Sequence, residues 1–299
     1  MDFFKIIDQL SEVDADVLGR FDSRRSVFNS LGSIAKRTAL AATPVFLGSL
    51  FQKAYGAPTS TPVEVLNYAL TLELLEADFY RQFIATGFIP TGAPAAAIAQ
   101  IKKHEDSHVT LLTGAIRSLG GTLVTGTATT GIRFKGLPST IPNTYAGYLI
   151  VAQVLEDAGV RAYKGRAGEL LGTDLLTTAL QIHSVEARHA AHIRTMRGQT
   201  PWVNSVAGTS PIDDLATHPV YTNGLTGTAT TTFTGGGSSY TVPAYSAASP
   251  LESNVTQSGV NLTTGIGTYT AADAAASFDE YLQAAEILDA SRAGGLVQL

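Results

Sequence analysis

Apolar residues between positions 61 and 198 recur every three or four positions, which is the spacing of helices that bury one face. This pattern predicts four long helices, at roughly residues 62–86, 94–119, 143–167 and 173–197. Short connectors at 87–93 and 168–173 predict that each consecutive pair forms an antiparallel hairpin. The segment 120–142 is long enough to run back along a helix of about 35 Å. The predicted fold class is therefore all-α, a four-helix bundle of two antiparallel hairpins joined by a long crossover.

The apolar face of each predicted helix also carries polar residues that can bind metal. They are Glu73 on the first helix, Glu105 and His108 on the second, Glu156 on the third, and Glu186 and His189 on the fourth. On the first and third helices a tyrosine, Tyr80 or Tyr163, follows the glutamate by seven positions and so lies on the same face. The two halves of the bundle thus repeat one pattern at an offset of 81 to 83 residues.

The spacing Glu-x-x-His occurs twice, at corresponding places in the two halves, although the chain has only six histidines. Residues three apart are neighbours on a helix surface, so one carboxylate and one imidazole can meet one ion. Four carboxylates inside a bundle would repel one another and lose their hydration unless cations compensate. Two divalent ions would balance the four negative charges. The pattern therefore predicts a site for two metal ions.

The composition narrows the other possible functions. Twenty-five acidic against twenty basic residues give a formal net charge of −5, which argues against nucleic acid as a partner. The absence of cysteine excludes disulfides, thiolate metal sites and cysteine nucleophiles. Any metal would be held by oxygen and imidazole nitrogen, which suits iron, manganese or zinc.

Four segments resemble bacterial proteins of the ferritin-like domain family, which includes desiccation-related members. These segments are Asn67–Tyr80 (NYALTLELLEADFY), His104–His108 (HEDSH), Leu155–Tyr163 (LEDAGVRAY) and Ser184–Arg194 (SVEARHAAHIR). The resemblance covers residues 62–200 and implies a ferritin-like bundle with two iron ions. It implies that Glu105 and Glu186 bridge the ions, that Glu73 and Glu156 are terminal ligands, and that His108 and His189 each cap one ion.

Some positions near these motifs differ from better-known relatives. Bacterioferritins often carry an aspartate before each bridging glutamate, which orients the opposite histidine, whereas this chain has His104 and Val185 there. Glu76 and Asp157 are candidate substitutes, with surface charge as the alternative for each. Three further histidines lie within one turn of the motifs: His104, His183 and His192. Each is a candidate additional ligand or proton relay, or else an ordinary polar neighbour.

The resemblance implies a protein that oxidises ferrous iron or removes peroxide or dioxygen during stress. Tyr80 and Tyr163 are then candidate catalytic residues, as hydrogen-bond donors or redox-active groups, or else plain core aromatics. The alternative enzyme is a dimanganese catalase. The alternative from another class is a structural or assembly protein that uses the bundle as a scaffold without turnover. Its long flanks could then support a homo-oligomer.

The N-terminal segment, residues 1–57, has two interpretations. Arg24 and Arg25 precede an apolar stretch at 38–52, as in a twin-arginine export signal, which would make the protein periplasmic or exported. Otherwise the segment is a helical arm of a cytoplasmic protein. The apolar stretch is too short to cross a bilayer, so we expect no integral membrane anchor.

The remaining segments flank the bundle, which we place at residues 58–200. Residues 201–270 are rich in Thr, Gly and Ser and predict loop, or a small hairpin turning at Gly235–Gly237. Residues 271–299 predict a C-terminal helix, from about Ala271 to Arg292, with Phe278 and Leu282 on one side.

Overall fold

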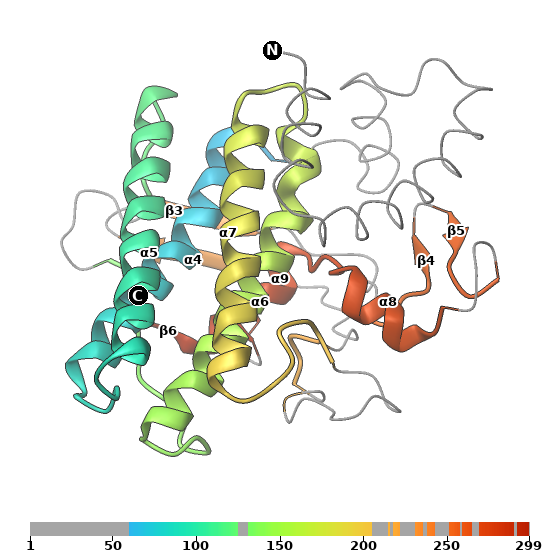
Figure 1. Ribbon diagram of the computed structural model, residues 1–299. Helices are drawn as coiled ribbons and strands as arrows, with labels where there is room; N and C mark the ends of the chain where they lie inside the picture. Colours follow the sequence, from blue (N-terminus) through green and yellow to red (C-terminus); the bar gives the residue numbers. More distant parts are fainter. Residues whose placement is uncertain are drawn as a thin grey trace, which may run out of the picture. The chain divides into compact units, whose positions relative to one another are not determined.

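The computed structural model describes residues 60–124, 131–204, 215, 218–221, 231–235, 238–242, 251–257, 259–264, 269–289 and 292–298. The bundle within these ranges consists of α4 (Pro62–Ala85), α5 (Ala93–Ser118), α6 (Tyr145–Ala167) and α7 (Leu175–Met196). All four helices lie within two residues of the predicted bounds. The predicted all-α bundle of two hairpins joined by a long crossover is therefore confirmed (Figure 1).

Local sequence explains where these helices begin. Thr61 accepts a hydrogen bond from the backbone of Glu64, whose carboxylate accepts one in return from the Thr61 N–H, and Pro62 occupies the first turn of α4. Thr144 accepts a hydrogen bond from the Gly147 N–H at the start of α6. The α4–α5 connector turns at Gly87 and Gly92, whose positive φ angles suit glycine.

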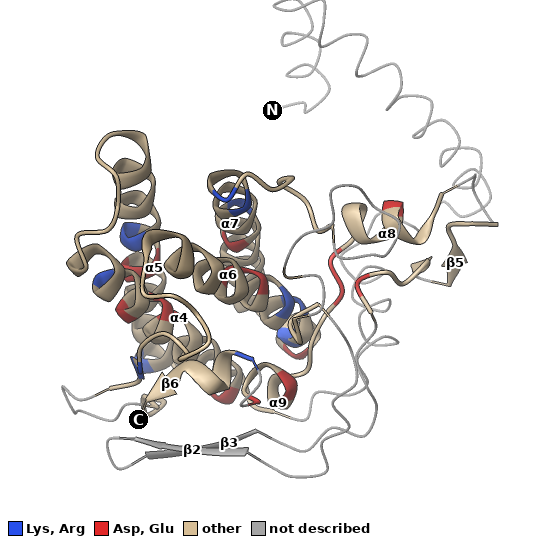
Figure 2. Cartoon of the chain, turned by 90° about the horizontal axis from the view of Figure 1, so that it is seen from below, with Lys and Arg blue, Asp and Glu red and all other residues tan. Residues whose placement is uncertain are grey.

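The hairpins α4–α5 and α6–α7 pack around a common core (Figure 1). One end of that core is aromatic: Phe83 stacks on Tyr148, and Phe79 meets Phe134 edge to face. Helix α6 is buried around most of its circumference, because the C-terminal part of the chain covers its outer side through α9 (Ala284–Ile287). Acidic residues lie on all four bundle helices, as the end-on view shows (Figure 2).

The crossover is tied to the outer side of α4. Its strand β1 (Arg133–Phe134) pairs antiparallel with β6 (Val297–Gln298) near the C-terminus. Phe134 is buried, its N–H donates to Asp78, and its carbonyl accepts from the Gln82 amide at 2.7 Å. Asn67 holds another part of the crossover by accepting from the Val124 N–H. The crossover therefore covers α4 as the C-terminal segment covers α6.

The prediction of one continuous helix from Ala271 to Arg292 is wrong. The structure has α8 (Ala271–Ser277), an extended stretch, α9, and the 3₁₀ helix η2 (Ala293–Leu296) before β6. The extended stretch lies against α6: Arg161 Nε donates to the Glu280 carbonyl at 2.8 Å, and the Leu282 N–H donates to the Arg161 carbonyl. Contacts to α6 thus replace the hydrogen bonds of a helix.

Gly165 of α6 makes this close approach possible. A Cβ at this position would lie 2.2 Å from the Leu282 carbonyl oxygen, so any other residue would push the extended stretch away. The predicted apolar side is kept only in part, because Leu282 is buried but Phe278 is 39% exposed. Tertiary contacts have overridden the helical periodicity of this segment.

The Thr/Gly/Ser-rich segment contains the hairpin that was one of its two predicted forms. Strand β2 (Thr231–Gly235) pairs antiparallel with β3 (Ser238–Val242). A second short pair joins β4 (Thr256–Gln257) to β5 (Val260–Asn261). The predicted export signal or arm at 1–57 lies outside the described residues. Among the helices that the structure describes, none is long and apolar enough to cross a membrane.

Candidate metal centre

The four predicted glutamates all point into the bundle. Glu73 on α4, Glu105 on α5, Glu156 on α6 and Glu186 on α7 have no exposed surface, and His108 and His189 are also buried. Residues i and i+3 of a helix lie side by side, so each Glu-x-x-His pair presents both groups to the same space. The structure therefore brings all six predicted ligand residues together at one level of the core.

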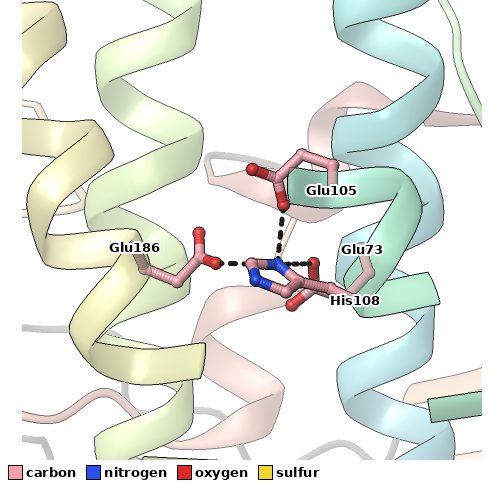
Figure 3. A group of neighbouring side chains, drawn as sticks. All are labelled: Glu73, Glu105, His108 and Glu186. Atoms are coloured by element: carbon pink, nitrogen blue, oxygen red, sulfur yellow. Dashed lines mark hydrogen bonds and ion pairs between the residues drawn. The ribbon is translucent and has the colours of Figure 1, made fainter. Parts of the chain in front are cut away.

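One group of ligand atoms surrounds His108, whose ring lies between three carboxylates from three different helices (Figure 3). Its Nδ1 lies 3.1 Å from Glu73 Oε2, 3.1 Å from Glu105 Oε2 and 3.2 Å from Glu186 Oε1. One ligand atom from each of the four residues lies within 4.8 Å of the others. This group has the size and donor set of a cation site.

A second group surrounds His189. The Nδ1 atom of His189 lies 2.9 Å from Glu105 Oε1 and 3.2 Å from Glu156 Oε2. Glu186 completes the group, and its four ligand atoms again lie within 4.8 Å of one another. The two groups share Glu105 and Glu186. The arrangement is thus two adjacent positions with two carboxylates in common.

Both predicted tyrosines touch the cluster, and each reaches across to the other half of the repeat. The Tyr80 hydroxyl on α4 donates to Glu156 Oε1 on α6, and the Tyr163 hydroxyl on α6 donates to Glu73 Oε1 on α4. Burial, followed by the adjacent carboxylates, raises the pKa of both tyrosines well above the ordinary value. They therefore stay protonated and act as hydrogen-bond donors.

Without a metal ion, burial and mutual repulsion disfavour the charged forms of several carboxylates in the cluster. Burial, reinforced by the nearby Glu105, raises the pKa of Glu73 to about 7, although His108 acts in the opposite direction. Burial and neighbouring carboxylates raise the pKa of Glu186 well above its ordinary value. Burial also disfavours a charged Glu105, but hydrogen bonds from His108 and His189 outweigh it and lower its pKa to about 2.

The same contacts favour the charged forms of the two histidines. Burial disfavours their charged forms, yet the surrounding carboxylates outweigh it and raise the pKa of His108 to about 12 and that of His189 to about 11. Two imidazolium ions then face a cluster of carboxylates. The histidines act as the cations that the cluster requires.

An oxygen without a partner lies in the part of the cluster that the two groups share, which fits a metal ion. Within the described residues, Glu186 Oε2 is buried with no hydrogen-bond or ion-pair partner, whereas Glu186 Oε1 and Glu105 Oε1 are paired only with His108 and His189. Buried oxygens without partners cost about 1–3 kcal/mol each, and more when charged. All three oxygens belong to the two carboxylates that both groups share, where a cation would satisfy them.

Glu76 and Asp157 are both buried, so the alternative interpretation of each as a surface charge is wrong. Asp157 accepts a hydrogen bond from Tyr221 and forms an ion pair of 2.5 Å with Arg194. It therefore joins α6 and α7 to the C-terminal part of the chain. Glu76 instead lies among the cluster: burial, then Glu186, then Glu156 raise its pKa well above the ordinary value.

The other three candidate histidines differ in whether they contact the cluster. His104 Nδ1 lies 2.9 Å from His189 Nε2, and the two rings stack at 5.1 Å with an interplanar angle of 7°. His183 Nδ1 lies 3.0 Å from the Val160 carbonyl, and His192 is exposed. Only His104 therefore contacts a residue of the cluster.

Sequence reasoning missed Tyr221 and gave Glu76 an open role. Tyr221 lies in a segment without periodicity, so no pattern could have placed its hydroxyl beside Asp157. A signal for Glu76 did exist. It lies three residues after Glu73, and the corresponding position three residues after Glu156 is Gly159, which leaves space for a side chain from the facing helix.

Residues 61–199 match the family model described as a ferritin-like domain. None of the curated proteins compared with the chain matches it.

Proposed function

Residues 61–199 belong to the ferritin-like domain family, and we propose that they bind two iron ions which react with dioxygen or peroxide. The protein would then act as a ferroxidase or a peroxidase. Its biological role would be to remove ferrous iron or peroxide during stress. Oxygen and imidazole donors also suit manganese, so a dimanganese catalase is the second candidate.

The observation that carries this proposal is the sharing of Glu105 and Glu186 by two adjacent groups of buried ligand atoms. A single structural ion would need only one such group. Two groups with two carboxylates in common are suited to a pair of ions held close together. The four carboxylates of the two groups also balance two divalent charges.

In this proposal Glu105 and Glu186 would contribute ligand oxygens to both positions. Glu73 with His108, and Glu156 with His189, complete the two positions. Iron bound there would supply electrons for the reduction of dioxygen or peroxide. Each histidine would bind through Nδ1, the atom that already faces the carboxylates, and would lose its proton when the ion enters.

Tyr80 and Tyr163 fix the terminal carboxylates in this arrangement. Each hydroxyl holds Oε1 of its glutamate, and Oε2 of the same glutamate faces a histidine of the cluster. The tyrosines thus leave one oxygen of each terminal glutamate for an ion. As buried phenols beside the site, they are also candidate electron donors.

A small cavity lies on the far side of Tyr163, and none of the six ligand residues lines it. The cavity measures about 20 Å³ and adjoins Tyr163. Its walls are almost entirely apolar, with Leu66, Leu72, Leu112 and Ala179 among them. A space of this size admits a molecule about as large as water, and an apolar cavity stays dry.

Metal analysis of protein purified from its native host tests the ion and its stoichiometry. We expect two ions per chain. The metal-free protein is then loaded anaerobically with ferrous iron, mixed with oxygen or peroxide, and followed by absorbance. We expect fast oxidation in the natural protein and in Asp106→Asn, which removes an exposed carboxylate next to Glu105.

The double variant Glu105→Ala, His108→Ala provides the comparison that decides. If the natural protein oxidises iron no faster than this variant, the redox proposal is wrong. Oxygen evolution from peroxide after manganese loading would favour the catalase instead. Metal binding that raises the melting temperature, with no turnover for either metal, would leave a structural role for the bundle.

A further inference from the structure

The pattern of Glu, His and Tyr repeats across the two halves of the cluster, but two neighbouring positions break the repeat. Glu76 on α4 corresponds to Gly159 on α6, since each follows a terminal glutamate by three residues. His104 on α5 corresponds to Val185 on α7, since each precedes a shared glutamate by one residue. Each pair thus places a polar side chain in one half only.

Glu76 is a fifth carboxylate in the core. It is 2% exposed, and its Oε2 has no hydrogen-bond partner among the described residues. It occupies space that Gly159 leaves: a Cβ on Gly159 would lie 3.2 Å from Glu186 Oε2 and 3.6 Å from Glu76 Oε1. A buried carboxylate aimed at the cluster, with an oxygen that has no donor, is suited to binding a cation.

Glu76 lies on the side of the cluster that contains Glu156. Its Oε1 would lie 3.6 Å from a Cβ on Gly159, and Gly159 follows Glu156 by three residues, one turn along the same helix α6. Glu76 is on the same helix as Glu73. It nevertheless faces the ion position that Glu156 and His189 complete.

His104 contacts the histidine of the same ion position, on the side of its ring that faces away from the carboxylates. Its Nδ1 lies 2.9 Å from His189 Nε2, the ring nitrogen that faces away from Glu105 and Glu156. A partner on this nitrogen fixes the ring orientation of a histidine ligand. Val185 occupies the corresponding place in the other half and has no group that can form such a bond.

We propose that the two ion positions are unequal, and that the Glu156–His189 position binds metal more tightly than the Glu73–His108 position. Glu76 supplies the tighter position with an additional carboxylate ligand, and His104 is the positioning residue of its histidine. This inference rests on the proposed two-ion site, but not on any turnover. The ligand class is a divalent transition-metal cation.

Titration of the metal-free full chain with Mn²⁺ alone tests the proposal, with calorimetry for affinity and electron paramagnetic resonance for the state of the bound ion. We expect two binding steps at least about tenfold apart in affinity. The first equivalent should give the spectrum of an isolated Mn²⁺, and the second should replace it with that of a coupled pair.

Three variants assign the tighter step. Glu76→Gln, which keeps the shape of the side chain, and His104→Ala should each weaken the first step by about 10- to 100-fold and leave the second nearly unchanged. His104→Asn places an amide where Nδ1 was and should recover part of the loss. Asp106→Asn removes an exposed carboxylate from α5 and should change neither step.

Each outcome has a distinct meaning. Two equal steps in the natural chain, or variants that weaken both steps alike or neither, overturn the inequality while leaving the two-ion site intact. Mn²⁺ binding that is absent in the natural chain overturns the proposed function itself. Circular dichroism of each metal-free variant shows whether it has folded, and His104→Ala, at a partly exposed position, keeps the test decisive if Glu76→Gln does not fold.

Discussion

Replacing Gly159 by alanine should strengthen helix α6 and weaken metal binding at the same time. Glycine inside a helix costs about 1 kcal/mol relative to alanine, so Gly159→Ala should raise the free energy of unfolding of the metal-free protein by up to about 1 kcal/mol. The new methyl group, however, would lie 3.2 Å from Glu186 Oε2. This contact is tight enough to move the carboxylate by a few tenths of an ångström.

Metal affinity should respond strongly to that displacement. Metal–ligand distances are held within about 0.2 Å, and Glu186 contributes to both ion positions. We expect both steps of a Mn²⁺ titration to weaken by about tenfold or more, which corresponds to about 1.4 kcal/mol each. Gly159→Ala should therefore raise the stability of the metal-free protein and lower its affinity for metal.

Gly114→Ala is the matched control. Gly114 also lies inside a bundle helix, α5, but a Cβ there would meet no atom within 4 Å. It should show the same stability gain in urea unfolding and an unchanged Mn²⁺ titration. If Gly159→Ala binds both ions as tightly as the natural chain, the carboxylate of Glu186 is not a shared ligand, and our interpretation of the site fails.

Three further predictions concern the surroundings of the site. Asp157→Asn removes the charge partner of buried Arg194 and should destabilise the protein by about 3–5 kcal/mol in urea unfolding; a loss below 1 kcal/mol would contradict a buried ion pair. Tyr163→Phe removes a donor to a buried carboxylate and should lower the free energy of unfolding of the metal-free protein by about 1–2 kcal/mol, measured in the same way; no change would show that this hydrogen bond is not formed. Because the pKa values of His108 and His189 are about 12 and 11 without metal, both are protonated at neutral pH and must release protons on binding. Metal affinity should therefore rise between pH 6 and pH 8, and Mn²⁺ titrations that show no pH dependence would contradict the raised pKa values.

Much of the bundle could be predicted because its signals are local. Helix bounds follow from periodicity and from caps such as Thr61, and the inward direction of Glu105 and His108 follows from their three-residue spacing. The same reasoning failed where distant segments meet. The burial of Asp157 depends on Tyr221, and the break in the C-terminal helix depends on Arg161 and Gly165 of α6, contacts that no local pattern reveals.

The contacts of Arg161 also bear on where the protein could be cut. Its guanidinium donates to the carbonyls of Val220 and Glu280 and pairs with Glu252, all of which follow the bundle in sequence. Truncation after residue 200 would strand this buried charge and strip the cover from α6. The smallest independently folding unit is therefore larger than the segment that matches the family, and a recombinant fragment trimmed to residues 61–199 should be insoluble.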